Sequence, residues 1–158
     1  MTGPAVLSFG CRLNAAEGEA IRRHLAAAGR HDAVVLNGCA VTAEAEAQLR
    51  QAIRKARRDR PGAEIVVTGC AAQIAPERYA ALPEVDRVVG NAEKLRPETW
   101  RRGANARVQV GDLRQAPAPE ALSNGTARTR AFLTIQQGCD HACSFCVIPQ
   151  GRGANRSV

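Results

Sequence analysis

Aromatic side chains are scarce in this chain of 158 residues, at 3% of the sequence, although hydrophobic residues together make up 45%. A core must therefore be built from Ala, Val, Leu and Ile, and the length suffices for one such domain and the start of a second. No apolar run approaches the roughly 20 residues that span a membrane. The amino terminus lacks the basic and long apolar regions of a signal peptide, so we expect a cytoplasmic protein without membrane contact.

Lysine is also scarce, since the chain has 2 Lys against 20 Arg at a net charge of +7. Arg makes bidentate contacts with phosphate, and a basic surface is consistent with a nucleic-acid substrate, although many basic proteins bind none. Six basic residues lie on the outer face of a predicted helix at about 42–60, where a solvated surface is favoured over a substrate contact: Arg50, Arg54, Lys55, Arg57, Arg58 and Arg60.

Apolar stretches alternate with helical periodicities along the first 110 residues. Strands are predicted at 5–10, 33–37, 63–68, 85–90 and, at an edge, 107–110, and helices at about 14–28, 42–60, 76–82 and 91–101. Asn14 and Glu17 have the spacing of a capping box, and Gly29 is placed to stop the first helix. The alternation predicts an α/β fold with an open, mostly parallel sheet and helices on both faces.

Three cysteines each follow a predicted strand and a Gly: Cys11, Cys39 and Cys70, here called the strand-end cysteines. The carboxyl ends of parallel strands form the ligand crevice of an open sheet, so we expect the three thiols at one edge. Gly permits a tight turn, and a helix amino terminus favours the thiolate. The pattern favours a metal site with three protein ligands and an open position. Buried core cysteines, or one disulfide and a free thiol, are the alternatives.

The other three cysteines have the spacing C-x3-C-x2-C: Cys139, Cys143 and Cys146, here called the loop cysteines. The loop is too tight for an ordinary disulfide framework. Three thiolates can hold three irons of a cubane cluster, whereas a simple electron-transfer cluster uses four Cys, so one iron would stay open. A zinc site with His141 as fourth ligand is less favoured, because the chain has no second C-x2–4-C pair.

Residues 111–127 are rich in Pro, Ala and Gly and predict an interdomain linker. A strand at 130–136 then leads into the loop cysteines, and the tail 147–158 has Gly and Arg suited to a loop near phosphates. We therefore divide the chain into an α/β domain at 1–110, the linker, and the start of a second domain at 128–158.

With Phe145 before the last Cys, the cysteine loop resembles the S-adenosylmethionine (SAM) loop of radical SAM enzymes. Both cysteine sets together resemble the radical SAM methylthiotransferases over the whole chain, in the branch that acts on N6-threonylcarbamoyladenosine at position 37 of tRNA. The matching stretches are GCRLN at 10–14, NGCAVT at 37–42, TGCAAQ at 68–73, PEVD at 83–86 and GN at 90–91. Gly38 departs from the family, which more often has Thr there.

The resemblance implies two 4Fe–4S clusters and SAM as cofactors. The loop cysteines would bind the cluster that cleaves SAM to a 5′-deoxyadenosyl radical, with Phe145 beside the adenine. The radical would abstract hydrogen at C2 of the modified adenine. The strand-end cysteines would bind an auxiliary cluster that carries the sulfur, and a second SAM would donate the methyl group. The implied partners are tRNA and an electron donor such as flavodoxin or ferredoxin.

The resemblance also implies that much of the enzyme is missing. Its active site lies in a partial (β/α) barrel, and a full barrel takes on the order of 200 residues. We therefore expect an N-terminal fragment, with the first strand and cluster loop of a truncated barrel, that is inactive alone. Two alternatives are a non-catalytic iron–sulfur, zinc or RNA-binding scaffold, and a methylthiotransferase acting on isopentenyladenosine in tRNA or on a ribosomal protein.

Overall fold

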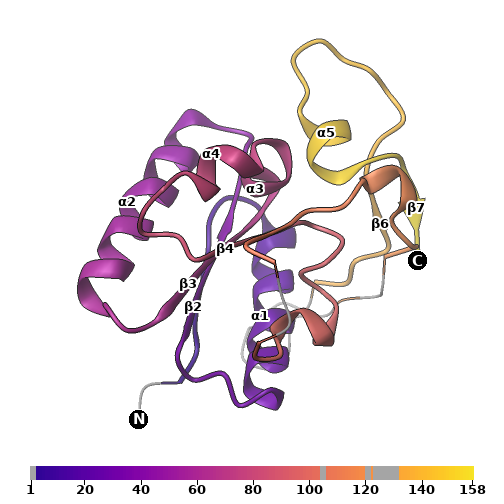
Figure 1. The fold of residues 1–158 in the computed structure, drawn as a ribbon. Coiled ribbons are helices and arrows are strands. Elements are labelled where there is room, and N and C mark those ends of the chain that lie inside the picture. The colour runs from indigo at the N-terminus through magenta and orange to yellow at the C-terminus, as the bar shows by residue number, and fades with distance from the viewer. Residues whose placement is uncertain (1–2, 104–105, 120–121, 123–131) are drawn as a thin grey trace.

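The computed structural model describes residues 3–103, 106–119, 122 and 132–158 (Figure 1). Its main sheet has five parallel strands in the order β1-β2-β3-β4-β5. Their bounds are β1 Ala5–Ser8, β2 Ala33–Gly38, β3 Glu64–Gly69, β4 Arg87–Val89 and β5 Val108–Gln109. The predicted α/β fold with a mostly parallel sheet is confirmed, and β5 lies at the edge as expected.

Two long helices cover opposite faces of this sheet: α1 Arg12–Ala27 and α2 Ala43–Asp59. Ile21 and Leu25 of α1 share one core cluster with Val35 and Val66. The neighbouring strand residues face the other way, into a second cluster with α2: Val34, Leu36, Ile65 and Val67 pack with Leu49, Ile53 and Ala56. The crossovers β1-α1-β2 and β2-α2-β3 move in the same direction across the sheet, but their helices lie on opposite faces. The two crossovers therefore have opposite handedness.

The helix ends follow local chemistry. Thr42 caps α2, since its hydroxyl accepts the Ala45 amide at 3.1 Å. Gly29 has a φ of 64° just after α1 and confirms the predicted stop. The predicted capping box is wrong, because α1 begins at Arg12 with Cys11 at its N-cap. Both residues of that box lie within α1 and are fully buried, so their side chains serve the interior of the protein.

The helix predicted at 91–101 is also wrong. Residues 91–95 form turns, and only η1 Pro97–Trp100, a 3-10 helix, follows. Pro97 restricts the residue before it to an extended backbone and lacks an amide for a helical bond. The predicted helix at 76–82 is present as α4 Pro76–Ala80, and it is preceded by α3 Cys70–Ile74, which was not predicted.

The carboxyl-terminal part returns to the end of the sheet where α3 begins (Figure 1). Its elements are η2 Leu113–Gln115, β6 Gln136–Gln137, α5 Ile148–Arg152 and β7 Arg156–Ser157. β6 and β7 pair antiparallel. Of the strand predicted at 130–136, only Gln136 is in a strand, and residues 130–131 lie outside the described residues. Residues 120–121 and 123–127 of the predicted linker lie outside them too.

No helix in the described part of the chain is long and apolar enough to cross a membrane.

Candidate functional site

All three strand-end cysteines lie at the carboxyl edge of the sheet. Cys11 is the N-cap of α1, and Cys70 is the first residue of α3. Cys39 and Cys70 each follow one of the two glycines that are paired in the register of β2 and β3. Cys39 and Cys70 are buried, whereas Cys11 is exposed. Loops from β1 and β2 leave toward opposite faces, which is the arrangement that opens a ligand crevice in such sheets.

Glycines beside these cysteines permit a close approach of the chain. Gly10 and Gly69 have φ values of 88° and 96°, which favour glycine. A Cβ on Gly10 would lie 2.7 Å from Cys39 Sγ, so the Cys39 side chain fills the space that Gly10 leaves. Gly38 has no positive φ. A Cβ there would instead collide with the tip of the Leu49 side chain, so its lack of a side chain lets α2 pack close to β2.

Shared location does not amount to a formed metal site. Among the residues that the structure describes, no group of three or more His, Cys, Asp or Glu is arranged to hold a metal ion. The assignment of both cysteine sets as ligands therefore stays a prediction. The chemistry of the strand-end set fits an iron–sulfur cluster, since Cys39 Sγ accepts the Val41 amide at 3.4 Å and Cys70 Sγ accepts two donors. Sulfur with this acceptor role is typical of thiolates and of cluster ligands.

The loop cysteines lie on a projecting loop whose base is tied to the tail. The Cys139 amide donates to the Gly153 carbonyl at 3.1 Å, and the Cys146 amide donates to the Cys143 carbonyl at 3.1 Å. Cys143 is exposed and the Phe145 side chain is 88% exposed. The loop therefore presents Phe145 to solvent.

Helix α5 joins this loop to the strand-end cysteines. It packs against α3, and a Cβ on Gly151 would lie 3.3 Å from Cys70 Sγ. The Asn91 side-chain amide donates to the Gly151 carbonyl and, at 3.6 Å, to Cys70 Sγ. The side-chain oxygen of Gln73 in turn accepts the backbone N–H of Asn91 at 2.8 Å. The tail is thus held within the interior of the site.

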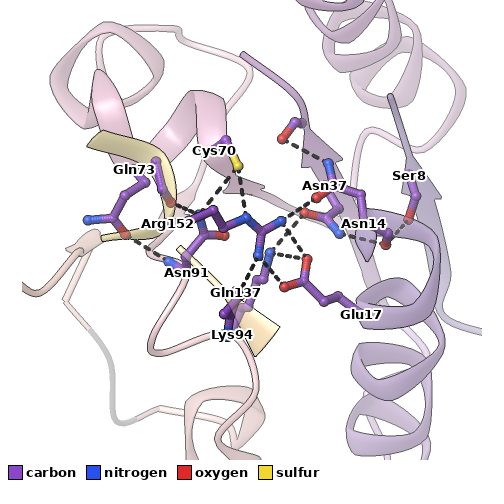
Figure 2. A network of polar contacts seen from close by, with 12 residues as sticks. Ser8, Asn14, Glu17, Asn37, Cys70, Gln73, Asn91, Lys94, Gln137 and Arg152 are labelled. Carbon is purple, nitrogen blue, oxygen red and sulfur yellow. Dashed lines mark hydrogen bonds and ion pairs between the residues drawn. The ribbon is translucent and has the colours of Figure 1, made fainter. Parts of the chain in front are cut away.

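Arg152, at the end of α5, lies at the centre of a buried polar network that sequence reasoning missed (Figure 2). Its Nε donates to Cys70 Sγ at 3.1 Å, and its Nη2 donates to Asn14 Oδ1 at 2.7 Å and to Glu17 Oε2 at 3.0 Å. Lys94 Nζ donates to the same carboxylate at 2.6 Å. The side chains of Glu17, Lys94 and Arg152 are 1%, 0% and 5% exposed. The tail predicted to suit phosphates therefore buries its first arginine.

The asparagines of this network hold the backbone around it. Asn14 Nδ2 donates to the carbonyls of Phe9 at 2.9 Å and Gly38 at 3.1 Å. Asn37 Nδ2 donates to the Asn14 carbonyl at 2.9 Å. These bonds link the ends of β1 and β2 to the first turn of α1, so they fix the turns that carry Cys11 and Cys39.

The charges of the network shift one another's pKa values. Burial raises the pKa of Glu17, but attraction to Arg152 and Lys94 outweighs this and lowers it to about 2. Burial lowers the pKa of Arg152, yet attraction to Glu17, with contributions from Cys70 and Cys11, raises it above its ordinary value. Burial lowers the pKa of Lys94, with Glu17 opposing. We infer that Glu17 and Arg152 are both charged at neutral pH.

The predicted basic face of α2 divides into two groups. Arg57 donates to the Ala63 carbonyl at 3.0 Å and pairs with Asp86 at 2.6 Å, Arg50 pairs with Glu46, and Arg60 donates to the His31 carbonyl at 3.2 Å. These cations serve the fold. The other exposed cations line a shallow hollow of about 510 Å³ and have no ion pair within the described residues: Arg54, Lys55 and Arg58.

Fold and site together define an α/β domain that gathers three cysteines at the carboxyl edge of a parallel sheet, beside a segment that carries three more. Residues 4–90 match a family described as Uncharacterized protein family UPF0004. The chain belongs to this family.

Curated relatives match almost the whole chain. It is similar to the threonylcarbamoyladenosine tRNA methylthiotransferase MtaB of Rickettsia prowazekii, with 43% identity over 155 residues, which cover 97% of this chain and 37% of the relative. The MtaB enzyme of Bacillus subtilis is 37% identical over 99% of this chain and 38% of its own length. A tRNA-2-methylthio-N(6)-dimethylallyladenosine synthase of Anaeromyxobacter sp. (strain Fw109-5) is 36% identical, over 94% and 36%. The chain thus spans less than two fifths of these relatives.

Proposed function

We propose that this chain is the N-terminal part of a radical SAM tRNA methylthiotransferase that inserts sulfur and a methyl group at C2 of N6-threonylcarbamoyladenosine at position 37 of tRNA. The observation that carries the proposal is the pairing of the strand-end cysteines with the C-x3-C-x2-C loop on one chain. The identity of 43% to the MtaB enzyme of Rickettsia prowazekii, against 36% to the dimethylallyladenosine synthase, supports this branch. The rest of the relatives' length would supply the barrel of which residues 128–158 form the start.

The residues have separate tasks in this proposal. The strand-end cysteines hold the auxiliary 4Fe–4S cluster, and the loop cysteines hold the cluster that binds SAM, with Phe145 against the adenine. When bound, the two clusters supply the electron that cleaves SAM and the sulfur that is transferred. Helix α5 keeps the loop segment beside the sheet edge, because Gly151 and Arg152 contact Cys70. tRNA is the proposed substrate, with a flavodoxin or ferredoxin as electron donor in the cytoplasm.

Anaerobic reconstitution with iron and sulfide tests the proposal on the chain itself. We expect two cubane clusters per chain, seen by iron and sulfide analysis and by electron paramagnetic resonance (EPR) after reduction. Replacing the strand-end cysteines by Ala should remove one cluster, and replacing the loop cysteines should remove the other. SAM should change the spectrum only when the loop cysteines are present. Stoichiometric zinc without any effect of SAM would contradict the proposal and favour a non-catalytic scaffold.

The substrate is tested separately on the full-length enzyme. A strain that lacks its own threonylcarbamoyladenosine methylthiotransferase should regain the methylthio group on that nucleoside, as measured by mass spectrometry of digested tRNA. Methylthiolation of isopentenyladenosine or of a ribosomal protein instead would keep the enzyme class and change the branch.

A further inference from the structure

The buried network at the carboxyl edge contains two basic side chains and one carboxylate. Glu17 is shared by Lys94 and Arg152, and neither cation has a second carboxylate partner within the described residues. While Lys94 is protonated, as its ion pair with Glu17 favours against the effect of burial, one positive charge is left over in a region with almost no exposure to water. An uncompensated buried charge is strongly unfavourable, so such a group normally lies next to a counter-charge.

The excess charge is directed at the strand-end cysteines. Arg152 is held by Glu17 and Asn14 on one side, and its remaining Nε–H points to Cys70 Sγ at 3.1 Å (Figure 2). Lys94 stays on the far side of the Glu17 carboxylate and also lies 3.4 Å from Asn37 Oδ1. The guanidinium is the one group of the three that contacts a cysteine sulfur.

The size of the excess matches the group proposed for this site. An oxidised cubane core with two positive charges and three thiolate ligands together carry one negative charge. Arg152 would balance it with one positive charge, and its N–H would bond a ligand sulfur. Net charge and hydrogen bonds to sulfur are both known determinants of the reduction potential of iron–sulfur clusters.

We propose that Arg152 is a positioning residue of the strand-end metal site, which raises the reduction potential of its cluster when the segment bearing the loop cysteines docks on the sheet edge. The inference rests on the proposed function for the presence of that cluster. It adds a link between the two cysteine sets, because the residue that contacts Cys70 belongs to the segment that follows the loop cysteines.

The test uses the 158-residue chain with Cys139, Cys143 and Cys146 replaced by Ala, so that one cluster remains. The cluster is titrated anaerobically with dithionite and redox mediators, and its one-electron reduction is followed by EPR. We expect Arg152→Ala to disfavour reduction about tenfold, a shift of ~59 mV to lower potential. Arg152→Lys keeps the charge but loses the rigid Nε–H donor, so it should restore part of the shift.

Arg30→Ala is the matched control. Arg30 is also a buried arginine in an ion pair, with Glu64, but it lies at the amino edge of the sheet. Its removal should leave the potential unchanged. An Arg152→Ala potential equal to that of the parent, or an equal shift in Arg30→Ala, overturns the inference. If Arg152→Ala takes up no cluster, the Arg152→Lys variant tests the inference instead. A reduction potential equal to that of the parent in Arg152→Lys would contradict the role of the Nε–H···S bond. A parent that binds no iron and sulfide contradicts the proposed function itself, and the inference with it.

Discussion

The two ends of the central sheet each carry a cluster of ion pairs, and the two clusters differ in their access to water. At the amino edge, Arg30 and Arg87 share Glu64, whose side chain is 22% exposed. At the carboxyl edge, Lys94 and Arg152 share Glu17, whose side chain is 1% exposed. The same arrangement of two cations around one carboxylate is thus semi-exposed at one edge and fully buried at the other.

The difference indicates that the two clusters have different purposes. At the amino edge the arginines also donate to the carbonyls of Trp100 at 3.4 Å and Thr99 at 2.9 Å, so they fasten the chain near η1 to the sheet. Water can screen what the pairs leave uncompensated. At the carboxyl edge the charged side chains are buried, and a buried ion pair is weak evidence for stability as such. A buried network beside three cysteines is better explained by a functional site.

The largest effect is expected from removing the shared carboxylate. Glu17→Ala leaves Lys94 and Arg152 buried without a counter-charge, which should lower the free energy of unfolding by about 3–5 kcal/mol. Glu64→Ala removes the equivalent group at the amino edge and should cost about 1–2 kcal/mol, since Arg30 keeps Asp32 as a partner at 3.2 Å. Urea unfolding followed by circular dichroism measures both. Equal losses would show that the two clusters do not differ in burial as described.

The pH dependence of stability is a second way to distinguish the two clusters of ion pairs. The pKa of Glu17 falls from 4.5 to about 2 on folding, so its contribution is fully present above pH 4.5 and is lost as the pH falls through about 2. The shift corresponds to about 3 kcal/mol. Urea midpoints should therefore drop more steeply between pH 5 and 2 in the parent than in Glu17→Gln.

Asp32 provides the control for that titration. Burial raises the pKa of Asp32, but the hydrogen bond and attraction of Arg30 outweigh this and lower it, and the Asp32 side chain is 39% exposed. Asp32→Asn should keep almost the whole pH dependence of the parent. A parent-like slope in Glu17→Gln would contradict the assignment of the acid-sensitive charge to the carboxyl edge.

Iron loading should stabilise the protein through the carboxyl edge and not through the amino edge, and this effect should be somewhat smaller than the preceding ones. A bound cluster stabilises the folded state by mass action, and we expect a rise in melting temperature of roughly 5–10 °C after anaerobic reconstitution. The variant in which Cys11, Cys39 and Cys70 are all Ala should lose the part of this rise that comes from the strand-end site. Glu64→Ala should melt lower than the parent yet gain as much from loading, as measured by differential scanning calorimetry.

Local sequence patterns predicted the sheet, but they failed where contacts between residues far apart in the sequence determine the structure. Apolar runs followed by Gly located the strands, because a buried parallel strand leaves a strong local signal. Arg152 and Glu17 are 135 residues apart, and no spacing rule covers such a pair. One signal was present: Glu17 lies on the same helical stripe as Ile21 and Leu25, so a buried carboxylate that needs a cation was foreseeable.

Two other features could not be predicted from local patterns. The right-handed rule for crossovers places consecutive helices on one face when strands follow in sequence order, yet α1 and α2 lie on opposite faces. The helix expected at 91–101 gives way to a looser turn in which Trp100 Nε1 donates to the Lys94 carbonyl at 2.9 Å and Thr99 Oγ1 to the Glu93 carbonyl at 2.8 Å. Bonds of this kind, from a side chain to a carbonyl six residues earlier, have no periodic signature in sequence.

The smallest effect is expected from three cations that belong to neither edge cluster: Arg54, Lys55 and Arg58. Because α2 runs from the carboxyl to the amino edge, they lie about 16 Å or more along the helix from its start near the cysteines. Replacing all three by Ala should change stability by no more than about 0.5 kcal/mol per residue. It should also leave the salt dependence of tRNA binding by the full-length enzyme unchanged, as measured by filter binding across a range of salt concentrations. A slope lower by about 1 per residue would mean that the RNA backbone follows α2 toward the amino edge. In that case recognition of tRNA, unlike the chemistry, would involve both ends of the sheet.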